Sequence, residues 1–172
     1  HLSIIASKDK DLRMVPGLQL DWDTGAIHDT GDDDFGYVEL VERTTASGTT
    51  KLLKGYGQKF FWAQMLIGDT ADNISGIPAI PGHVMNFIKP IAATKKALAI
   101  LEDENADEKK KAKAQATLDE RKDGLCGPST AILILDMIED ESTAFHTVKG
   151  LYKRYGEGAG FTHYKTGDPV PW

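Results

Sequence analysis

Apolar residues form short runs in the first third of the chain and helical patterns after it. Residues 2–6 are apolar and end at polar residues, which predicts a buried strand followed by a loop at 7–10. Residues 19–22 and 26–28 flank the turn Asp23-Thr24-Gly25, as the two strands of a hairpin do. A second hairpin is predicted from the alternating residues 37–43 and the returning residues 51–54.

Helical spacing replaces these short runs from Lys59 onwards. Residues 59–67 place apolar side chains at helical spacing and end at Gly68. Further helices are predicted at 83–88, 129–138 and 142–155. Residues 90–123 favour helix, but 102–122 are almost entirely polar, which predicts a solvated projecting helix or helical hairpin outside the core. The pattern therefore predicts a mixed α/β fold with a mainly helical C-terminal part.

Composition narrows the class of protein. The 172 residues are 41% hydrophobic, enough for a soluble domain with a core, and no apolar run approaches the roughly 20 residues of a membrane span. Cys126 is the single cysteine of the sequence, so we expect no disulfide framework and a reducing, cytoplasmic location. The net charge of −6 counts mildly against nucleic-acid binding, unless the acids gather around metal ions that neutralise them.

Two pairs of carboxylates each follow an apolar element. Asp9 and Asp11 alternate on the first loop, where a turn can aim both at one cation. Asp69 and Asp72 lie three residues apart, which places them on one side of a helical turn. Because Mg²⁺ prefers a few carboxylates plus water, the pairs predict a divalent-metal site. The alternatives are a solvated loop for the first pair and a helix cap, with Asp72 before Asn73, for the second.

Two segments resemble motifs of the 5′-nuclease family, which comprises phage 5′–3′ exonucleases, flap endonucleases and the 5′-nuclease domain of bacterial DNA polymerase I. Residues 4–12 (Ile-Ile-Ala-Ser-Lys-Asp-Lys-Asp-Leu) resemble its strand and acid-x-acid loop. Residues 68–80 (Gly-Asp-Thr-Ala-Asp-Asn-Ile-Ser-Gly-Ile-Pro-Ala-Ile) resemble its Gly-Asp-x-x-Asp-Asn-Ile-Pro-Gly block. Residues 125–133 are similar to the Gly-Ile-Gly-Pro-Lys-Thr-Ala segment that directly follows this block in the family, with Ser129 in place of the lysine.

The resemblance implies a domain organisation. Residues 1–57 would end a PIN-like α/β nuclease core, and residues 58–156 would form a helical DNA-binding subdomain with a helix–turn–helix (helix-hairpin-helix) element. Residues 81–124 would insert a long helix into that element, and residues 157–172 would form an irregular tail. The family's N-terminal half has no counterpart here, and His1 precedes an apolar run directly, so we expect a fragment, a processed product or half of a split protein.

The resemblance also implies an activity. Asp9, Asp11, Asp69 and Asp72 would hold Mg²⁺ or Mn²⁺ in a two-metal site that hydrolyses DNA phosphodiester bonds at 5′ ends or flaps, as in phage DNA replication. Turn carbonyls would hold K⁺, and the location would be the host cytoplasm if a phage encodes the protein. The expected contacts to the DNA backbone are made by Lys51, Lys54, Lys59, Asn73, Gly76, Ile77, Gly82, Gly127, Ser129 and Thr130.

Other interpretations stay open at this point. The chain could be a non-catalytic module that binds duplex DNA, or a subunit that needs a separate N-terminal nuclease chain to complete its active site. The run Asp32-Asp33-Asp34 lacks the spacing of an EF-hand and is predicted to be a loop. The histidines at 28, 83, 146 and 163 show no spacing typical of metal ligands.

Overall fold

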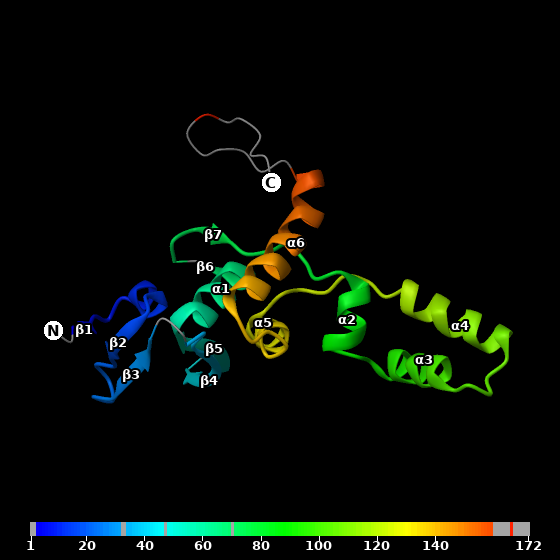
Figure 1. Cartoon of the computed structure of the whole chain (residues 1–172), viewed down its shortest axis with the longest axis horizontal. Coiled ribbons are helices and arrows are strands. Elements are labelled where there is room, and N and C mark those ends of the chain that lie inside the picture. The colour runs from blue at the N-terminus through cyan, green and yellow to red at the C-terminus, as the bar shows by residue number, and fades with distance from the viewer. Residues whose placement is uncertain (1–2, 32–33, 47, 70, 160–165, 167–172) are drawn as a thin grey trace. The chain divides into compact units, whose positions relative to one another are not determined.

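The structure is a computed structural model that describes residues 3–31, 34–46, 48–69, 71–159 and 166 (Figure 1). The chain forms two compact units: residues 1–77 with 127–172, and residues 78–126. Strands and helices build the first unit and helices the second, so the predicted mixed α/β class is confirmed. In the part of the chain that the structure describes, no helix has both the length and the apolar character of a membrane span.

The first unit begins with a three-stranded sheet in the order β1 (Ile4–Ala6), β2 (Gly17–Leu20), β3 (Ile27–Thr30). Strand β1 is parallel to β2, which pairs with β3 antiparallel, so the first predicted hairpin is confirmed. The prediction that the first strand is buried is wrong, because Ile4 is 47% exposed. Strand β1 is an edge strand with one neighbour, and an edge strand is covered less than a central one.

The second predicted hairpin is also confirmed. Strands β4 (Tyr37–Thr45) and β5 (Gly48–Tyr56) pair antiparallel along their whole length, from Tyr37 opposite Tyr56 to Thr45 opposite Gly48. Burial increases toward Tyr56, which is 4% exposed. Helix α1 (Gly57–Ile67) continues directly from this buried end, where the hairpin meets the core.

Three helices supply most of the core of the first unit. Helix α1 packs against α5 (Pro128–Leu135) and α6 (Glu141–Ala159), which follow it more than 60 residues later. Their buried side chains include Phe60, Trp62, Leu66, Ile134, Leu135 and Val148. Helix α6 extends past the end predicted at Gly156, since a glycine lowers helix propensity without by itself ending a helix. Residues 157–159 of the predicted irregular tail are therefore helical, and most of the remaining tail lies outside the described residues.

The second unit contains α2 (Gly82–Ile88), α3 (Ala92–Glu102) and α4 (Glu108–Asp119). Ile80 and Gly124 exchange two backbone hydrogen bonds, of 2.6 and 2.8 Å, and so close the unit at its ends. Inside it, Asn86 donates to the carbonyl of Leu118 (2.9 Å) and accepts from the hydroxyl of Thr94 (3.1 Å). These buried bonds connect the end of α2 to both α3 and α4.

The expectation of one inserted long helix is wrong, and the alternative of a helical hairpin is confirmed. The break lies at residues 103–107, where Asp103 accepts a hydrogen bond from the amide of Asn105. Asp107 caps α4 by accepting from the amide of Lys110 (2.8 Å). The polar segment also contributes to the core, since Ala114 and Leu118 are buried against Ala97.

Candidate functional site

Three of the four predicted carboxylates lie together. Asp11 belongs to the 3-10 helix η1 (Lys10–Met14), and Asp69 and Asp72 belong to a short hairpin of β6 (Gly68–Asp69) and β7 (Ile74–Ser75). One carboxylate oxygen of each lies within 4.8 Å of the others. The fold thus gathers acids that are 58 residues apart in the sequence.

Asp9 lies outside this group of three carboxylates, and its role as a metal ligand stays a prediction. Asp9 is the N-cap of η1, and its carboxylate accepts a hydrogen bond from the amide of Asp11 (3.1 Å). Asp9 has extended backbone and precedes η1, whereas Asp11 lies within it. Asp9 is therefore directed to the helix end and Asp11 to the hairpin.

The hairpin also differs from the helical turn predicted for Asp69 and Asp72. Gly68 pairs with Ser75 and Asp69 with Ile74, and Asn73 takes the left-handed conformation (φ 57°) that asparagine tolerates. Gly68 has a φ of 76°, and a Cβ there would collide with the backbone of Ser75 and Gly76. The carboxylate of Asp69 accepts from the amide of Ala71 (3.0 Å), so the motif encodes a tight hydrogen-bonded turn.

Lys10 is the positive charge within this group. Its ammonium forms an ion pair and hydrogen bond with Asp69, whose side chain is 11% exposed. This bond, aided by the amide of Ala71, lowers the pKa of Asp69 below its ordinary value. One lysine faces three carboxylates, so the group retains an excess of negative charge that favours a further cation.

The three carboxylates border a hollow of about 290 Å³ with largely apolar walls. Phe61, Met65 and Tyr152 line it, and the hydroxyl of Tyr152 donates to the carbonyl of Met65 (2.6 Å). Apolar walls lower the local dielectric and strengthen the attraction between carboxylates and a cation. The hollow therefore offers a cation oxygen ligands on one side and apolar side chains on the other.

The donor set fits a divalent ion that prefers oxygen. Mg²⁺ binds oxygen at about 2.1 Å in octahedral geometry, so neighbouring ligands stand about 3.0 Å apart and opposite ligands about 4.2 Å apart. From the observed limit of 4.8 Å, the oxygens would have to approach one another by up to about 2 Å. Asp11 and Asp72 are exposed side chains on short elements, so they have room for this movement. The ammonium of Lys10 would have to leave Asp69 when an ion binds.

The predicted DNA-binding lysines each lie next to a carboxylate. In the β4–β5 register, Lys51 stands opposite Glu42 and Lys54 opposite Glu39. Lys59 is held more firmly, since it pairs with Asp136 (3.3 Å) and its side chain is only 17% exposed. These partners reduce the positive potential that the lysines could offer to a phosphate backbone.

The predicted turn residues have several structural roles. Asn73 occupies the exposed hairpin turn, and the amide of buried Ile77, after Gly76, donates to the carbonyl of Leu66 (3.1 Å). Gly82 belongs to the second unit, where its amide donates to Asp123 (2.7 Å). Gly127 caps α5 and accepts from the amides of Thr130 and Ala131, with Ser129 in the same first turn. DNA contacts and K⁺ binding by these residues stay predictions.

Sequence reasoning missed a second group of interacting side chains. The ring of His28 stacks on that of Tyr56, with centroids 4.2 Å apart, and its Nδ1 forms a hydrogen bond of 2.9 Å with the hydroxyl of Tyr37. The hydroxyl of Tyr56 donates to the carboxylate of Asp21 (3.1 Å). The amides of Thr24 and Asp23 lower the pKa of buried Asp21 to about 2, and burial raises the pKa of Tyr56 to about 12. The turn sequence Asp21-Trp22-Asp23-Thr24-Gly25 could have indicated part of this group, because an aspartate before such a turn often accepts hydrogen bonds from the backbone amides of the turn.

No protein-family model, curated protein or solved structure matches this chain. The resemblance of residues 4–12, 68–80 and 125–133 to the 5′-nucleases stays a prediction that rests on those motifs. The gathering of Asp11, Asp69 and Asp72 is an observation that stands independently of it.

Proposed function

We propose that this chain is a metal-dependent nuclease of the 5′-nuclease type, which hydrolyses phosphodiester bonds at 5′ ends or flaps of DNA. The observation that supports this proposal most directly is the approach of Asp11, Asp69 and Asp72 to within 4.8 Å. Under this proposal, residues 1–57 end a PIN-like core and the helices after them carry the DNA-binding element.

The proposal assigns each side chain a physical role. Asp11, Asp69 and Asp72 would hold Mg²⁺ or Mn²⁺, which supplies an activated water and stabilises charge on the scissile phosphate. Carboxylates this close repel one another, and Lys10 offsets only part of that repulsion, so metal binding relieves an existing electrostatic cost. Phe61 and Met65 would form an apolar wall on one side of the bound ion.

Cleavage of a labelled 5′-flap DNA by the full chain tests the proposal, with Mn²⁺ in one reaction and EDTA in the other. We expect short 5′ products only with Mn²⁺, and we expect Asp69→Asn combined with Asp72→Asn to abolish them. Asp9→Asn is the matched control, because Asp9 lies in the same motif but outside the gathered carboxylates. Full cleavage by the double variant would rule the assignment out.

A second candidate function is a non-catalytic DNA-binding module. The observation that favours it is the ion pair of Lys10 with Asp69, which balances part of the acidic group without a metal. Binding of the same flap DNA in Ca²⁺, without cutting in Mn²⁺, would favour this candidate. Cutting that returns when a separate N-terminal nuclease chain is added would instead favour a two-chain enzyme.

A further inference from the structure

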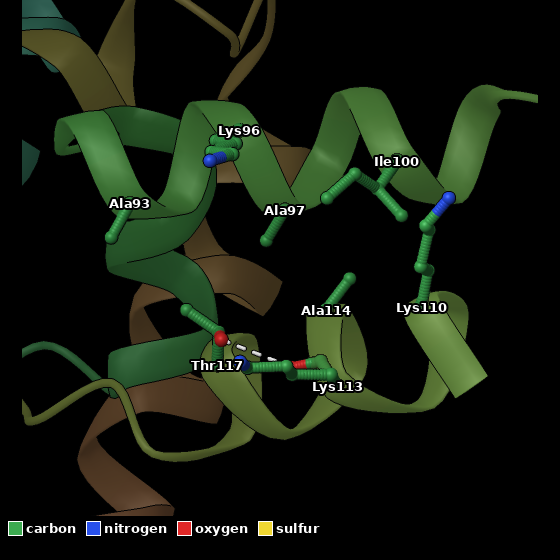
Figure 2. A pocket seen from close by; sticks show the side chains of 8 residues that line it. All are labelled: Ala93, Lys96, Ala97, Ile100, Lys110, Lys113, Ala114 and Thr117. Carbon is green, nitrogen blue, oxygen red and sulfur yellow. Dashed lines mark hydrogen bonds between the residues drawn. The ribbon is translucent and has the colours of Figure 1, made fainter. Parts of the chain in front are cut away.

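The helical hairpin of the second unit carries a groove that the proposed nuclease function leaves unused. Figure 2 shows it between α3 and α4, with Ala97 and Ala114 pointing toward one another across its centre. The groove has a volume of about 390 Å³ and a largely apolar surface. Ile100 extends the apolar surface, and the hydroxyl of Thr117 is bonded to the carbonyl of Lys113 (3.0 Å), so it needs no further partner.

The core of this hairpin is small for two helices of this length. Its buried apolar side chains are Ala97, Ala114 and Leu118, with partly buried leucines and isoleucine around them. Two alanines bury little apolar area, and two helices packed against each other cover only one side of each. An added helix lying in the groove would cover this surface and pack against both α3 and α4.

The rim of the groove is positively charged. Lys96 on α3 and Lys110 and Lys113 on α4 line it, and no acidic side chain does. The acids of the hairpin lie instead at its ends, in residues 102–108 and 119–123. Lys110 pairs with Asp107 (3.5 Å), but both side chains are well exposed, and such a pair is readily exchanged for another carboxylate.

We propose that this groove binds an acidic amphipathic helix of a partner protein. Apolar side chains of that helix would cover Ala97, Ala114 and Ile100, and carboxylates on its flanks would pair with the three lysines. The lining of α3 runs from Ala93 to Ile100, about 10 Å of helix axis, so two to three turns of the partner would fill it.

The charges of the groove decide between this partner and two others. A second copy using the same face would bring lysine rims together, and like charges across an interface oppose association. A nucleic-acid backbone would match the lysines but would leave the apolar floor uncovered. An acidic amphipathic helix matches both features.

Fluorescence anisotropy with the full chain tests the proposal. The probe is a synthetic capped helical peptide with Leu at i, i+3, i+4 and i+7 and Glu on both flanks, labelled with an uncharged dye. One control peptide has the same residues in scrambled order, and a second has Lys in place of Glu. We expect the Glu peptide to bind at least tenfold tighter than either control, and to weaken as salt rises to about 0.5 M.

Two charge-reversed double variants locate the binding. We expect Lys96→Glu with Lys113→Glu to weaken binding of the Glu peptide at least tenfold. Lys95→Glu with Lys109→Glu is the matched control, because it makes the same charge change on the same helices at exposed residues outside the groove lining. We expect this control to stay within twofold of the wild type, and circular dichroism to show both variants folded.

Several results would overturn the proposal. These are no binding of the Glu peptide by the wild type, equal binding of the scrambled peptide, or equal losses in the two double variants. A wild-type dimer in sedimentation that Lys96→Glu with Lys113→Glu dissociates would assign the groove to a second copy. Tighter binding of a duplex DNA, lost in the same variant, would assign it to nucleic acid.

Discussion

The two compact units differ in how the sequence builds their cores. In the first, α1 packs against helices more than 60 residues away, and large side chains such as Phe60, Leu66 and Leu135 are fully buried. In the second, residues 78–126 form a continuous unit whose hairpin core relies on two alanines, one leucine and the hydrogen bonds of Asn86. Because the first core buries larger side chains, we expect truncation of a buried residue there to lower the free energy of unfolding more than the same change in the second core.

The units also differ in charge, which the net value of −6 conceals. Residues 78–126 carry nine lysines and arginines against eight aspartates and glutamates, while the rest of the chain carries eleven against eighteen. The acidic excess therefore belongs to the unit that contains Asp11, Asp69 and Asp72. The mild objection to nucleic-acid binding from the net charge applies to that unit and not to residues 78–126.

The largest expected effect comes from truncating the first core. Leu135 is completely buried, so we expect Leu135→Ala to lower the free energy of unfolding by about 3–4 kcal/mol through lost burial and a residual cavity. Urea unfolding followed by tryptophan fluorescence measures it, because residues 78–126 contain no tryptophan. The matched change Leu118→Ala should leave this transition in place, and a loss below about 1 kcal/mol for Leu135→Ala would contradict the comparison.

A glycine substitution should damage the second unit selectively. A Cβ at Gly82 would collide with the carbonyl oxygen of Arg121, so we expect Gly82→Ala to cost about 2–3 kcal/mol. Amide exchange in α2 and α4 measures the loss, and the tryptophan transition of the first unit should not move. Gly127→Ala is the control, since a Cβ there meets nothing within 4 Å. Unchanged exchange with weakened DNA binding would instead support the predicted DNA contact of Gly82.

A smaller effect is expected from Asp21, which belongs to the first unit. We expect Asp21→Asn to lower the free energy of unfolding by about 1–2 kcal/mol at neutral pH, because it weakens the bonds from Thr24, Asp23 and Tyr56. The pKa of Asp21 is depressed from 3.8 to about 2 in the fold, so its contribution is present above about pH 4 and is lost as pH falls toward 2.

Urea unfolding of the wild type and Asp21→Asn at several pH values measures this contribution. The stability difference between the two should shrink as the pH falls from about 4 to about 2. Asp23→Asn, an exposed change in the same turn, is the control and should alter the free energy of unfolding by less than about 0.5 kcal/mol. A difference that does not vary with pH would show that the Asp21 carboxylate is not the source.

Local patterns in the sequence predicted most elements of the fold. The turn residues around Thr24 and Gly48 predicted the positions of both hairpins, and helical spacing predicted α1, α2, α5 and α6. The break between α3 and α4 was harder to predict from the sequence. It depends on two side-chain hydrogen bonds: Asp103, after α3, accepts from the amide of Asn105, and Asp107, before α4, accepts from the amide of Lys110. The exposure of β1 depends on which strands neighbour it, and a short apolar run carries no information on that.

The candidate site was predicted in part for a similar reason. The order of the motifs predicted that Asp11, Asp69 and Asp72 lie close together, as the structure shows. Residue spacing alone could not show that Asp9 caps a 3-10 helix that contains Asp11. The contact between Lys10 and Asp69 joins residues 59 positions apart, and it depends on how η1 lies against the β6–β7 hairpin. The stacking of His28 on Tyr56 likewise joins separate hairpins, so spacing within one element could not reveal it.

The central claim is that three carboxylates, and not four, form a divalent-metal site. Titration of Mn²⁺ into the full chain, followed by calorimetry, tests it most directly. We predict specific binding by the wild type, at least tenfold weaker binding by Asp11→Asn, Asp69→Asn and Asp72→Asn, and binding within twofold of the wild type for Asp9→Asn. No Mn²⁺ binding by the wild type, or a loss in Asp9→Asn as large as in the other three variants, would contradict the account.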